Sequence, residues 1–165
     1  MKIQTAVIED LPELRDIYNY EVEHGASTLD LTVRTMEDRL LWFNAHNREN
    51  HPLLDAVDEG DGHIMGYASL SPYRNKEAYR TTVEASIYVA PADRRKGVAS
   101  KLMEALIETA RKDPGTHLIV SVITGGNTAS EHLHEKFGFT FVGTMHEVGM
   151  KFGRYLDIDN YELKV

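Results

Sequence analysis

The sequence predicts an α/β protein in which helices pack around one mixed sheet. Segments with a helical spacing of apolar residues alternate along the chain with short runs rich in β-branched and aromatic residues. The length of 165 residues suits one domain better than two. A hydrophobic content of 42% and a charged content of 27% are ordinary for a globular protein. We therefore expect a single domain over residues 1–165.

The N-terminal half predicts the first strand, two helices and then three strands. Residues 2–8 form a short run with β-branched residues, which favours a strand. Asp10 precedes apolar residues at helical spacing, and a second helix is expected over residues 35–47. The three strands that follow are expected over residues 53–57, 64–70 and 82–89.

The C-terminal half completes the order β-α-α-β-β-β-α-β-α-β-β. Residues 98–112 place apolar side chains on one helix face, and a helix that begins near Asn127 ends at Gly138, a residue typical of helix C-termini. The remaining strands are expected over residues 118–124, 139–148 and 156–163. The first of these is apolar enough to suit a strand that is buried on both faces.

The charge and the residue types exclude several classes of function. There is no cysteine, which excludes disulfides, cysteine nucleophiles and thiolate metal sites. A formal net charge of -8 disfavours binding to nucleic acid or to an anionic membrane. The first residues lack the apolar run of a signal peptide, and no stretch approaches the roughly 20 apolar residues that cross a bilayer. We expect a cytoplasmic protein with no nucleic-acid or membrane partner.

A glycine-containing loop between the strand at 82–89 and the next helix has the properties of an anion site. Gly97 and Ala99 are small, so an anion can approach the backbone where the first turn of the helix offers unpaired amides. Positive charge is added by Arg94, Arg95 and Lys96. The loop therefore predicts a diphosphate site, although a solvated basic loop at a helix start has the same composition.

Several motifs, in the right order, resemble the GNAT N-acetyltransferase superfamily. Arg94-x-x-Gly97-x-Ala99 matches the signature Arg/Gln-x-x-Gly-x-Gly/Ala of that superfamily. Residues 127–139 (Asn-Thr-Ala-Ser-Glu-His-Leu-His-Glu-Lys-Phe-Gly-Phe) are similar to its next motif, Asn-x-x-Ser…Glu-Lys-x-Gly-Phe. Four further segments are similar to the phosphinothricin and methionine sulfoximine acetyltransferase subgroup: 18–19, 66–69, 83–89 and 148–157.

The resemblance implies one mixed, mostly antiparallel sheet with splayed central strands and about four helices, in a single N-acetyltransferase domain. It implies acetyl-CoA as co-substrate, no metal, a small-molecule amine as acceptor and a homodimer. The pantetheine arm is expected between the splayed strands, paired with backbone groups like an added strand. The cofactor-binding residues that it implies are Ile87, Tyr88, Val89, Arg94, Arg95, Lys96, Gly97, Val98, Ala99, Ser100, Asn127 and Lys136.

Glu84 is the candidate general base. An ammonium group must lose a proton before the amine attacks a thioester, and a carboxylate in an apolar strand has a raised pKa that suits this task. The alternative is a solvent-facing carboxylate, and the match Val83-Glu84-x-Ser86 favours the functional interpretation. The chain departs from the subgroup at Ala85, where the subgroup often has His.

His134 is the candidate general acid for the leaving thiolate. By their spacing, Asn127, Ser130 and His134 share one face of a helix, and much of the superfamily has Tyr at the position of His134. A histidine can also donate a proton, but a packed or solvated histidine is equally compatible with the sequence. Asn127 is either a cofactor contact, an N-cap or both. His132 lies two residues from His134, which does not suit two metal ligands on a helix.

The loop before the Glu84 strand carries two arginines that suit an acceptor with an amine and a carboxylate. Arg grips a carboxylate through two parallel N–H donors, and the corresponding loop of the subgroup binds an amino-acid-like substrate. A surface loop with solvated arginines is the alternative. The candidate substrate-binding residues are Tyr73, Arg74, Asn75, Arg80 and Thr82.

The expected function is acetyl transfer from acetyl-CoA to the amino group of an amino-acid-like substrate, such as phosphinothricin or methionine sulfoximine. Direct attack in a ternary complex is the simplest mechanism, since the chain has no cysteine and no Gly-x-Ser-x-Gly elbow. A backbone N–H near Val89 is expected to hold the oxyanion. Two alternatives stay open: an acetyltransferase of protein N-termini or lysines, and an acyl-CoA-binding module without catalysis.

Overall fold

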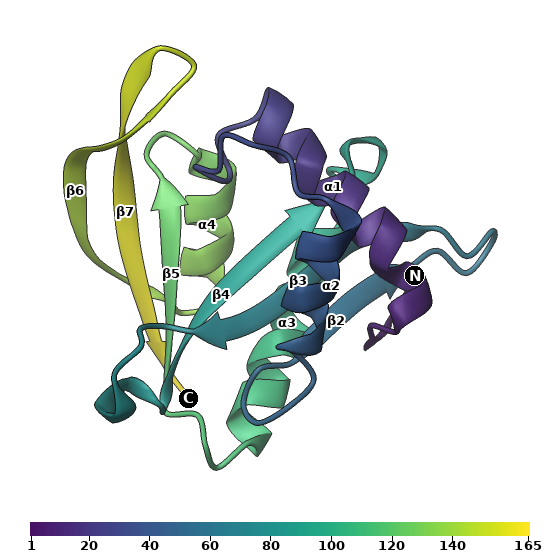
Figure 1. The fold of residues 1–165 in the computed structure, drawn as a ribbon. Helices are drawn as coiled ribbons and strands as arrows, with labels where there is room; N and C mark the ends of the chain where they lie inside the picture. Colours follow the sequence, from purple (N-terminus) through teal and green to yellow (C-terminus); the bar gives the residue numbers. More distant parts are fainter.

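The computed structural model describes all 165 residues, which form a seven-stranded sheet with helices on both faces (Figure 1). The strands are β1 (Lys2–Thr5), β2 (Leu53–Val57), β3 (Ile64–Pro72), β4 (Thr82–Val89), β5 (Leu118–Thr124), β6 (Thr140–Lys151) and β7 (Arg154–Lys164). The helices are α1 (Leu11–His24), α2 (Met36–Asn44), α3 (Val98–Lys112) and α4 (Thr128–Lys136). None of them combines the length and the apolar character that crossing a membrane requires.

The sheet has the order β1-β2-β3-β4-β5-β7-β6, and every neighbouring pair is antiparallel except β4 and β5. The parallel pairing joins Thr82–Glu84 of β4 to Leu118–Val120 of β5 and then stops. Beyond it β4 still pairs with β3, and β5 still pairs with β7, so the two strands diverge (Figure 1). The structure thus confirms the predicted fold class, including the splayed central strands.

The bounds predicted for β2, β4, α3 and β5 are confirmed, and the differences lie at element ends. The first strand stops at Thr5 because a 3-10 turn over Ile8–Asp10 leads into α1. β6 and β7 run further than predicted, to a tight turn in which Phe152 and Gly153 both have positive φ angles, of 51° and 73°. That geometry suits a two-residue hairpin turn, which extends both strands beyond the predicted bounds.

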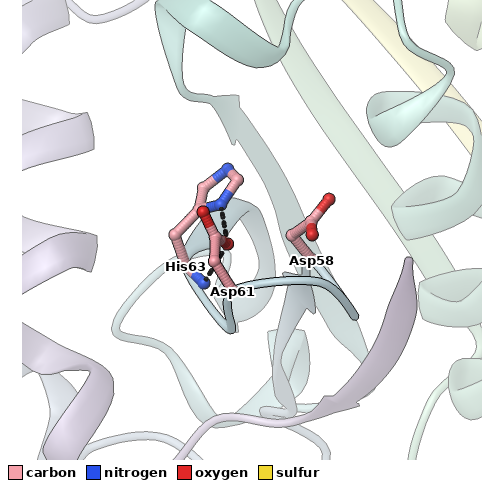
Figure 2. Close-up of side chains that lie close together, drawn as sticks. All are labelled: Asp58, Asp61 and His63. Carbon is pink, nitrogen blue, oxygen red and sulfur yellow. Dashed lines mark hydrogen bonds and ion pairs between the residues drawn. The ribbon is translucent and has the colours of Figure 1, made fainter.

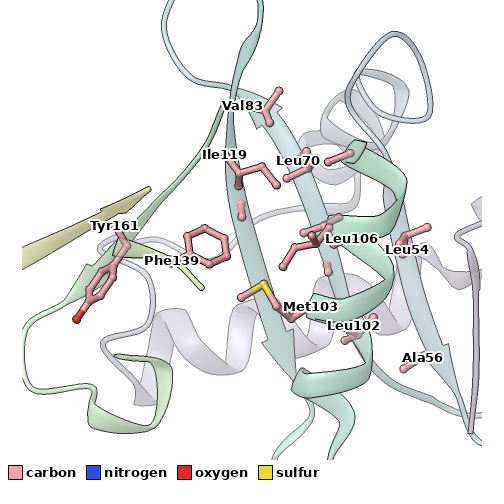
Figure 3. Packing of buried hydrophobic residues seen from close by; sticks show 14 of the residues in the cluster. Leu54, Ala56, Leu70, Val83, Leu102, Met103, Leu106, Ile119, Phe139 and Tyr161 are labelled. Atoms are coloured by element: carbon pink, nitrogen blue, oxygen red, sulfur yellow. The ribbon is translucent and has the colours of Figure 1, made fainter. Parts of the chain in front are cut away.

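Two clusters of side chains hold the helices on the sheet. The larger cluster lies under α3, whose residues Leu102, Met103 and Leu106 are fully buried against β2 to β5 (Figure 3). The smaller cluster lies on the opposite face, where α1 and α2 pack on β2 and β3. The prediction that residues 118–124 are buried on both faces is wrong at Val122, which is 40% exposed because it faces the gap between β4 and β5.

Asp55 is a fully buried carboxylate in the middle of β2. Neither of its carboxylate oxygens has a hydrogen-bond partner. Burial, followed by the neighbouring Asp10 carboxylate, raises its pKa from 3.8 to about 7. The folded protein therefore binds this proton between about pH 4 and pH 7, where the unfolded chain has released it. The protonated form of Asp55 therefore contributes its full share to the free energy of unfolding below about pH 4, and this contribution is lost as the pH rises to about 7.

Asp55→Asn should remove this loss. We expect the free energy of unfolding of the variant to gain on that of the wild type by up to about 4 kcal/mol between pH 4 and pH 7.5, from about 3 pH units at about 1.4 kcal/mol each. Urea titrations at several pH values would measure this. The exposed Asp16→Asn is the matched control, and a difference between Asp55→Asn and wild type that does not change with pH would contradict the assignment.

Candidate active site

A cavity of about 400 Å³ occupies the gap between β4 and β5; we call it the first cavity. Glu84, Ser86 and Tyr88 line it from β4, and residues 121–124 line it from β5. Its other walls come from α3, α4 and the loop after α1. A third cavity, of about 500 Å³, continues this gap toward α1 and shares Ile87, Tyr88 and Val89 with it. The splay of the strands thus opens into a continuous cleft.

Glu84 sits where the two strands part. It is the last residue of β4 that pairs with β5, and its half-buried side chain lines the first cavity. Burial raises the pKa of its carboxyl above the ordinary value of 4.5. A carboxylate with a raised pKa, next to a cleft, is suited to accept a proton from a bound amine.

His134 lies on α4, buried, and also lines the first cavity. Its Nδ1 is 2.7 Å from the carbonyl oxygen of Ser130, which can only accept, so Nδ1 carries the proton. Its Nε2 is 2.9 Å from Oγ of Ser121, and in the neutral ring it accepts that hydroxyl proton. Burial lowers the pKa of His134. At neutral pH the ring is therefore uncharged, and its one proton is engaged by the carbonyl of Ser130.

The loop before α3 has the backbone that an anion site needs. Arg95 and Gly97 have positive φ angles, of 64° and 83°, and Gly97 is the N-cap of α3. Val98 packs into the core and so anchors the first turn of the helix. Arg95, Lys96 and Gly97 are exposed, while Ala99 and Ser100 are half-buried and Ala99 lines the first cavity.

Two of the three basic side chains in this loop are already paired. Arg94 forms an ion pair with the buried Glu21 of α1 and lines the third cavity. Nζ of Lys96 is 2.9 Å from a carboxylate oxygen of Asp93, which is also buried. Arg95 forms no ion pair and remains available to a ligand. In the predicted basic cluster, Arg95 is therefore a free cation, while the ion pairs of Arg94 and Lys96 also hold the loop in place.

Asn127 fits both interpretations given to it. Its side-chain oxygen caps α4 by accepting from the backbone N–H of Ser130 at 3.3 Å, and the residue also lines the first and third cavities. Lys136, at the other end of α4, is exposed, lies over the ring of Phe137 and lines none of the three cavities.

The five residues predicted to bind the acceptor line none of these cavities. Arg74 and Arg80 are exposed; Arg74 lies over the ring of Tyr73, 4.8 Å from its centre. Asn75 is exposed in the same loop, and Thr82 is the first residue of β4. The structure does not bring this group together with Glu84.

A second cavity, of about 390 Å³, lies between α1, α2 and the strands β3 and β4. It shares Ser86 and Tyr88 with the first cavity, so the two adjoin across β4. Its lining includes six residues that the sequence did not predict as site residues, although three of them lie in the segments 18–19 and 66–69 that resemble the subgroup: Tyr18, Arg39, Trp42, Tyr67, Ser69 and Ser71. Two features of the sequence could have indicated this cavity. Polar side chains occupy every second position of the otherwise apolar β3, and an arginine lies on the buried face of α2.

One group of metal-ligand types gathers in the turn between β2 and β3, namely Asp58, Asp61 and His63 (Figure 2). Nδ1 of His63 is 2.6 Å from Asp61, and Nε2 is 3.1 Å from Asp93. These carboxylates, Asp61 first, raise the pKa of His63. None of the three residues lines a cavity described above. Through the contact between His63 and Asp93, the cluster links this turn to the loop before α3.

Comparison with known proteins places these features in a family. Residues 11–139 match the acetyltransferase (GNAT) family. The chain is 40% identical to the L-methionine sulfoximine/L-methionine sulfone acetyltransferase of Pseudomonas paraeruginosa, over 99% of this chain and 94% of that protein.

Two crystal structures have nearly the same fold over the whole chain. The GNAT superfamily phosphinothricin acetyltransferase from Sinorhizobium meliloti, in complex with acetyl-CoA, is 33% identical with a TM-score of 0.93, over 99% of this chain and 88% of that one. The ribosomal-protein-alanine N-acetyltransferase from Brucella melitensis is 38% identical with a TM-score of 0.95, over 100% of both chains. With a cleft between splayed strands and a glycine-containing loop before α3, the chain belongs to the acetyltransferase (GNAT) family and is an acetyl-CoA-dependent N-acetyltransferase.

Proposed function

We propose that the protein acetylates the α-amino group of a free amino-acid-like substrate of the phosphinothricin or methionine sulfoximine kind. The observation that carries this proposal is the position of Glu84, a partly buried carboxylate that lines the first cavity two residues before Ser86, where the first and second cavities adjoin. A donor in the cleft and an acceptor in the second cavity would meet at this residue. The name of the Pseudomonas relative supports the substrate class.

In the proposed mechanism the two substrates react directly in a ternary complex. Glu84 takes the proton of the bound ammonium, and the amine attacks the thioester carbonyl carbon of acetyl-CoA. A backbone N–H near Val89 stabilises the oxyanion. The nitrogen then loses its second proton, the C–S bond breaks and the thiolate takes up a proton. His134 stays the predicted donor, although with Nδ1–H bound to Ser130 it would first have to gain a proton at Nε2.

We propose that acetyl-CoA lies along the free edge of β4, with its diphosphate at the start of α3. Backbone amides in a left-handed turn at a helix start, together with the unpaired Arg95, support the diphosphate site. The proposed cofactor-binding residues are Ile87, Tyr88, Val89, Arg94, Arg95, Lys96, Gly97, Val98, Ala99, Ser100, Asn127 and Lys136. The predicted roles of Tyr73, Arg74, Asn75, Arg80 and Thr82 in acceptor binding stay predictions.

A second candidate function is acetylation of a protein N-terminus, favoured by the likeness to the Brucella enzyme. Release of CoA should be measured with free amino acids, with phosphinothricin and methionine sulfoximine, and with peptides that begin with alanine. Turnover of the free amino acids or analogues supports the first proposal. Turnover of peptides alone would replace it with the second.

We also propose that residues 1–165 act as one N-acetyltransferase domain and assemble as a homodimer. β6 is an edge strand of the sheet and carries exposed apolar side chains along its length and at its turn. These include Phe141, Met145, Met150 and Phe152, each more than half exposed. Light scattering on the purified protein would show a monomer if this proposal is wrong.

Glu84→Gln should lower kcat by at least about 100-fold at pH 7.5, because the amide cannot accept the proton. The Kd for acetyl-CoA should be unchanged. In the wild type, the acidic limb of kcat/KM should lie at a higher pH than an ordinary glutamate would give, since burial raises the pKa of Glu84. Glu104→Gln, at an exposed position of α3, is the control. Equal rates for Glu84→Gln and wild type would remove Glu84 from the mechanism.

Gly97→Ala should weaken acetyl-CoA binding by 10-fold or more, because its Cβ would crowd a diphosphate at the loop. Gly62→Ala is a close control, since both glycines have φ near +80° and nothing within 4 Å of an added Cβ. Each variant should lose about 1 kcal/mol of stability from left-handed strain, and only Gly97→Ala should raise the Kd measured by calorimetry. Equal Kd values for the two variants would argue against a diphosphate at this loop.

A further inference from the structure

The second cavity contains a buried positive charge without a counter-ion. Arg39 of α2 is only 4% exposed and forms no ion pair. Its Nη2 donates to the hydroxyl of Tyr67 at 3.3 Å, and its Nε has no partner. A buried guanidinium is costly unless its N–H groups and its charge are satisfied, so this arrangement calls for an anion.

Three aromatic rings lie around the guanidinium of Arg39. Its central carbon lies 3.6 Å from the ring centre of Trp42, 4.9 Å from that of Tyr18 and 5.7 Å from that of Tyr67. Such rings stabilise a cation through its flat face and hold it in one orientation. The N–H donors point outward in the guanidinium plane, which is the geometry that binds a planar carboxylate through two parallel hydrogen bonds.

The other charged side chains that line the second cavity are already engaged. Arg34 pairs with Asp30 at 2.6 Å, and Asp30 also accepts from the hydroxyl of Tyr18. Asp38 accepts from the backbone N–H of Thr35 at 2.9 Å as part of the cap of α2. The two arginines and two aspartates of this lining balance in formal charge, and Arg39 is the arginine among them that forms no ion pair.

On β3 the second cavity is lined by residues that pair with Glu84 and its neighbours on β4. On β3, Ser71 stands opposite Glu84 and Ser69 stands opposite Ser86, and these three serines line the second cavity. Opposite residues in antiparallel strands have Cα atoms about 5 Å apart. A group bound beside Ser71 would thus lie about one strand spacing from the proposed base. Arg39 reaches the same strand at Tyr67.

We infer that Arg39 binds the α-carboxylate of the acceptor and so positions the α-amine at Glu84. This inference rests on the proposed function and deepens it, because it makes the second cavity a subsite for free α-amino acids. A peptide N-terminus or an amino acid amide has no carboxylate at this position and leaves Arg39 unpaired. The enzyme should therefore discriminate against both, as sites with a buried polar group left unpaired do.

The test compares methionine sulfoximine with its α-carboxamide, which has the same amine and side chain and no α-carboxylate. The amide has the less basic amine, so chemistry alone favours the amide. For the wild type we expect kcat/KM to be about 100-fold higher for the acid, the usual effect of one buried charged contact. Arg39→Met should raise KM for the acid by a similar factor and leave turnover of the amide and binding of acetyl-CoA unchanged. Arg39→Lys should restore part of the preference.

A binding measurement tests the subsite without turnover. Trp42 is the one tryptophan of the chain and stacks on Arg39, so a carboxylate at Arg39 should change its fluorescence. The acid should do so and the amide should not. If no amino acid is acetylated yet the acid still changes the emission, the proposed function fails and the subsite stands.

Three outcomes would overturn the inference. The first is equal kcat/KM of the wild type for acid and amide, a result that does not depend on any variant folding. The second is an equal loss for both substrates in Arg39→Met and Arg39→Lys, which marks a structural role. The third is an Arg39 dependence that disappears with methionine, which lacks the side-chain oxygens, because Arg39 would then hold the side chain of the acceptor.

Discussion

The short parallel pairing between β4 and β5 is the constraint on which the site depends. Three residue pairs join the strands, and each strand then remains bonded to its other neighbour, β3 or β7. Their facing edges are left with backbone groups that need partners. A ligand with alternating amides along its length can supply them, and the pantetheine arm of acetyl-CoA is such a ligand. The same divergence leaves Glu84 at the point where the two strands separate. Its carboxylate is partly buried there and still accessible from the first cavity.

The two faces of the sheet carry hydrophobic clusters of different size. The larger cluster lies under α3, and His134, the predicted proton donor, packs against its member Phe139. On the α1 and α2 face the small cluster is accompanied by buried polar residues, among them Glu21, Arg39, His46 and Asp55. Buried polar groups cost stability unless they are paired. Among these four residues, Arg39 and Asp55 have buried side-chain atoms without a hydrogen-bond partner.

The sequence was sufficient for features that depend on local pattern. The amphipathic helix at 98–112, the glycine loop before it and the strand that holds Glu84 all have short-range signals, and the structure places them as expected. It was insufficient where a role depends on residues distant in the chain. In the sequence Arg39 is one of several charged residues in the helix expected over residues 35–47. Only the packing of α2 on β3 shows that it is buried against Trp42 and Tyr67. The pairing of Arg94 with Glu21 was hidden for the same reason.

α1 connects the loop before α3, the end of β6 and the loop after α1. Glu21 pairs with Arg94 in the cofactor loop, and its backbone carbonyl accepts from Nζ of Lys151 at 3.1 Å, at the end of β6. The same ammonium group donates to the carbonyl of Thr28 at 2.9 Å, which fixes the loop beside the first cavity. An anion at Arg94 competes with Glu21 for that guanidinium. If the donor binds at Arg94, it would therefore change the interaction that holds α1, which also lines the second cavity through Tyr18. This gives a physical reason for the two substrates of the proposed reaction to bind interdependently.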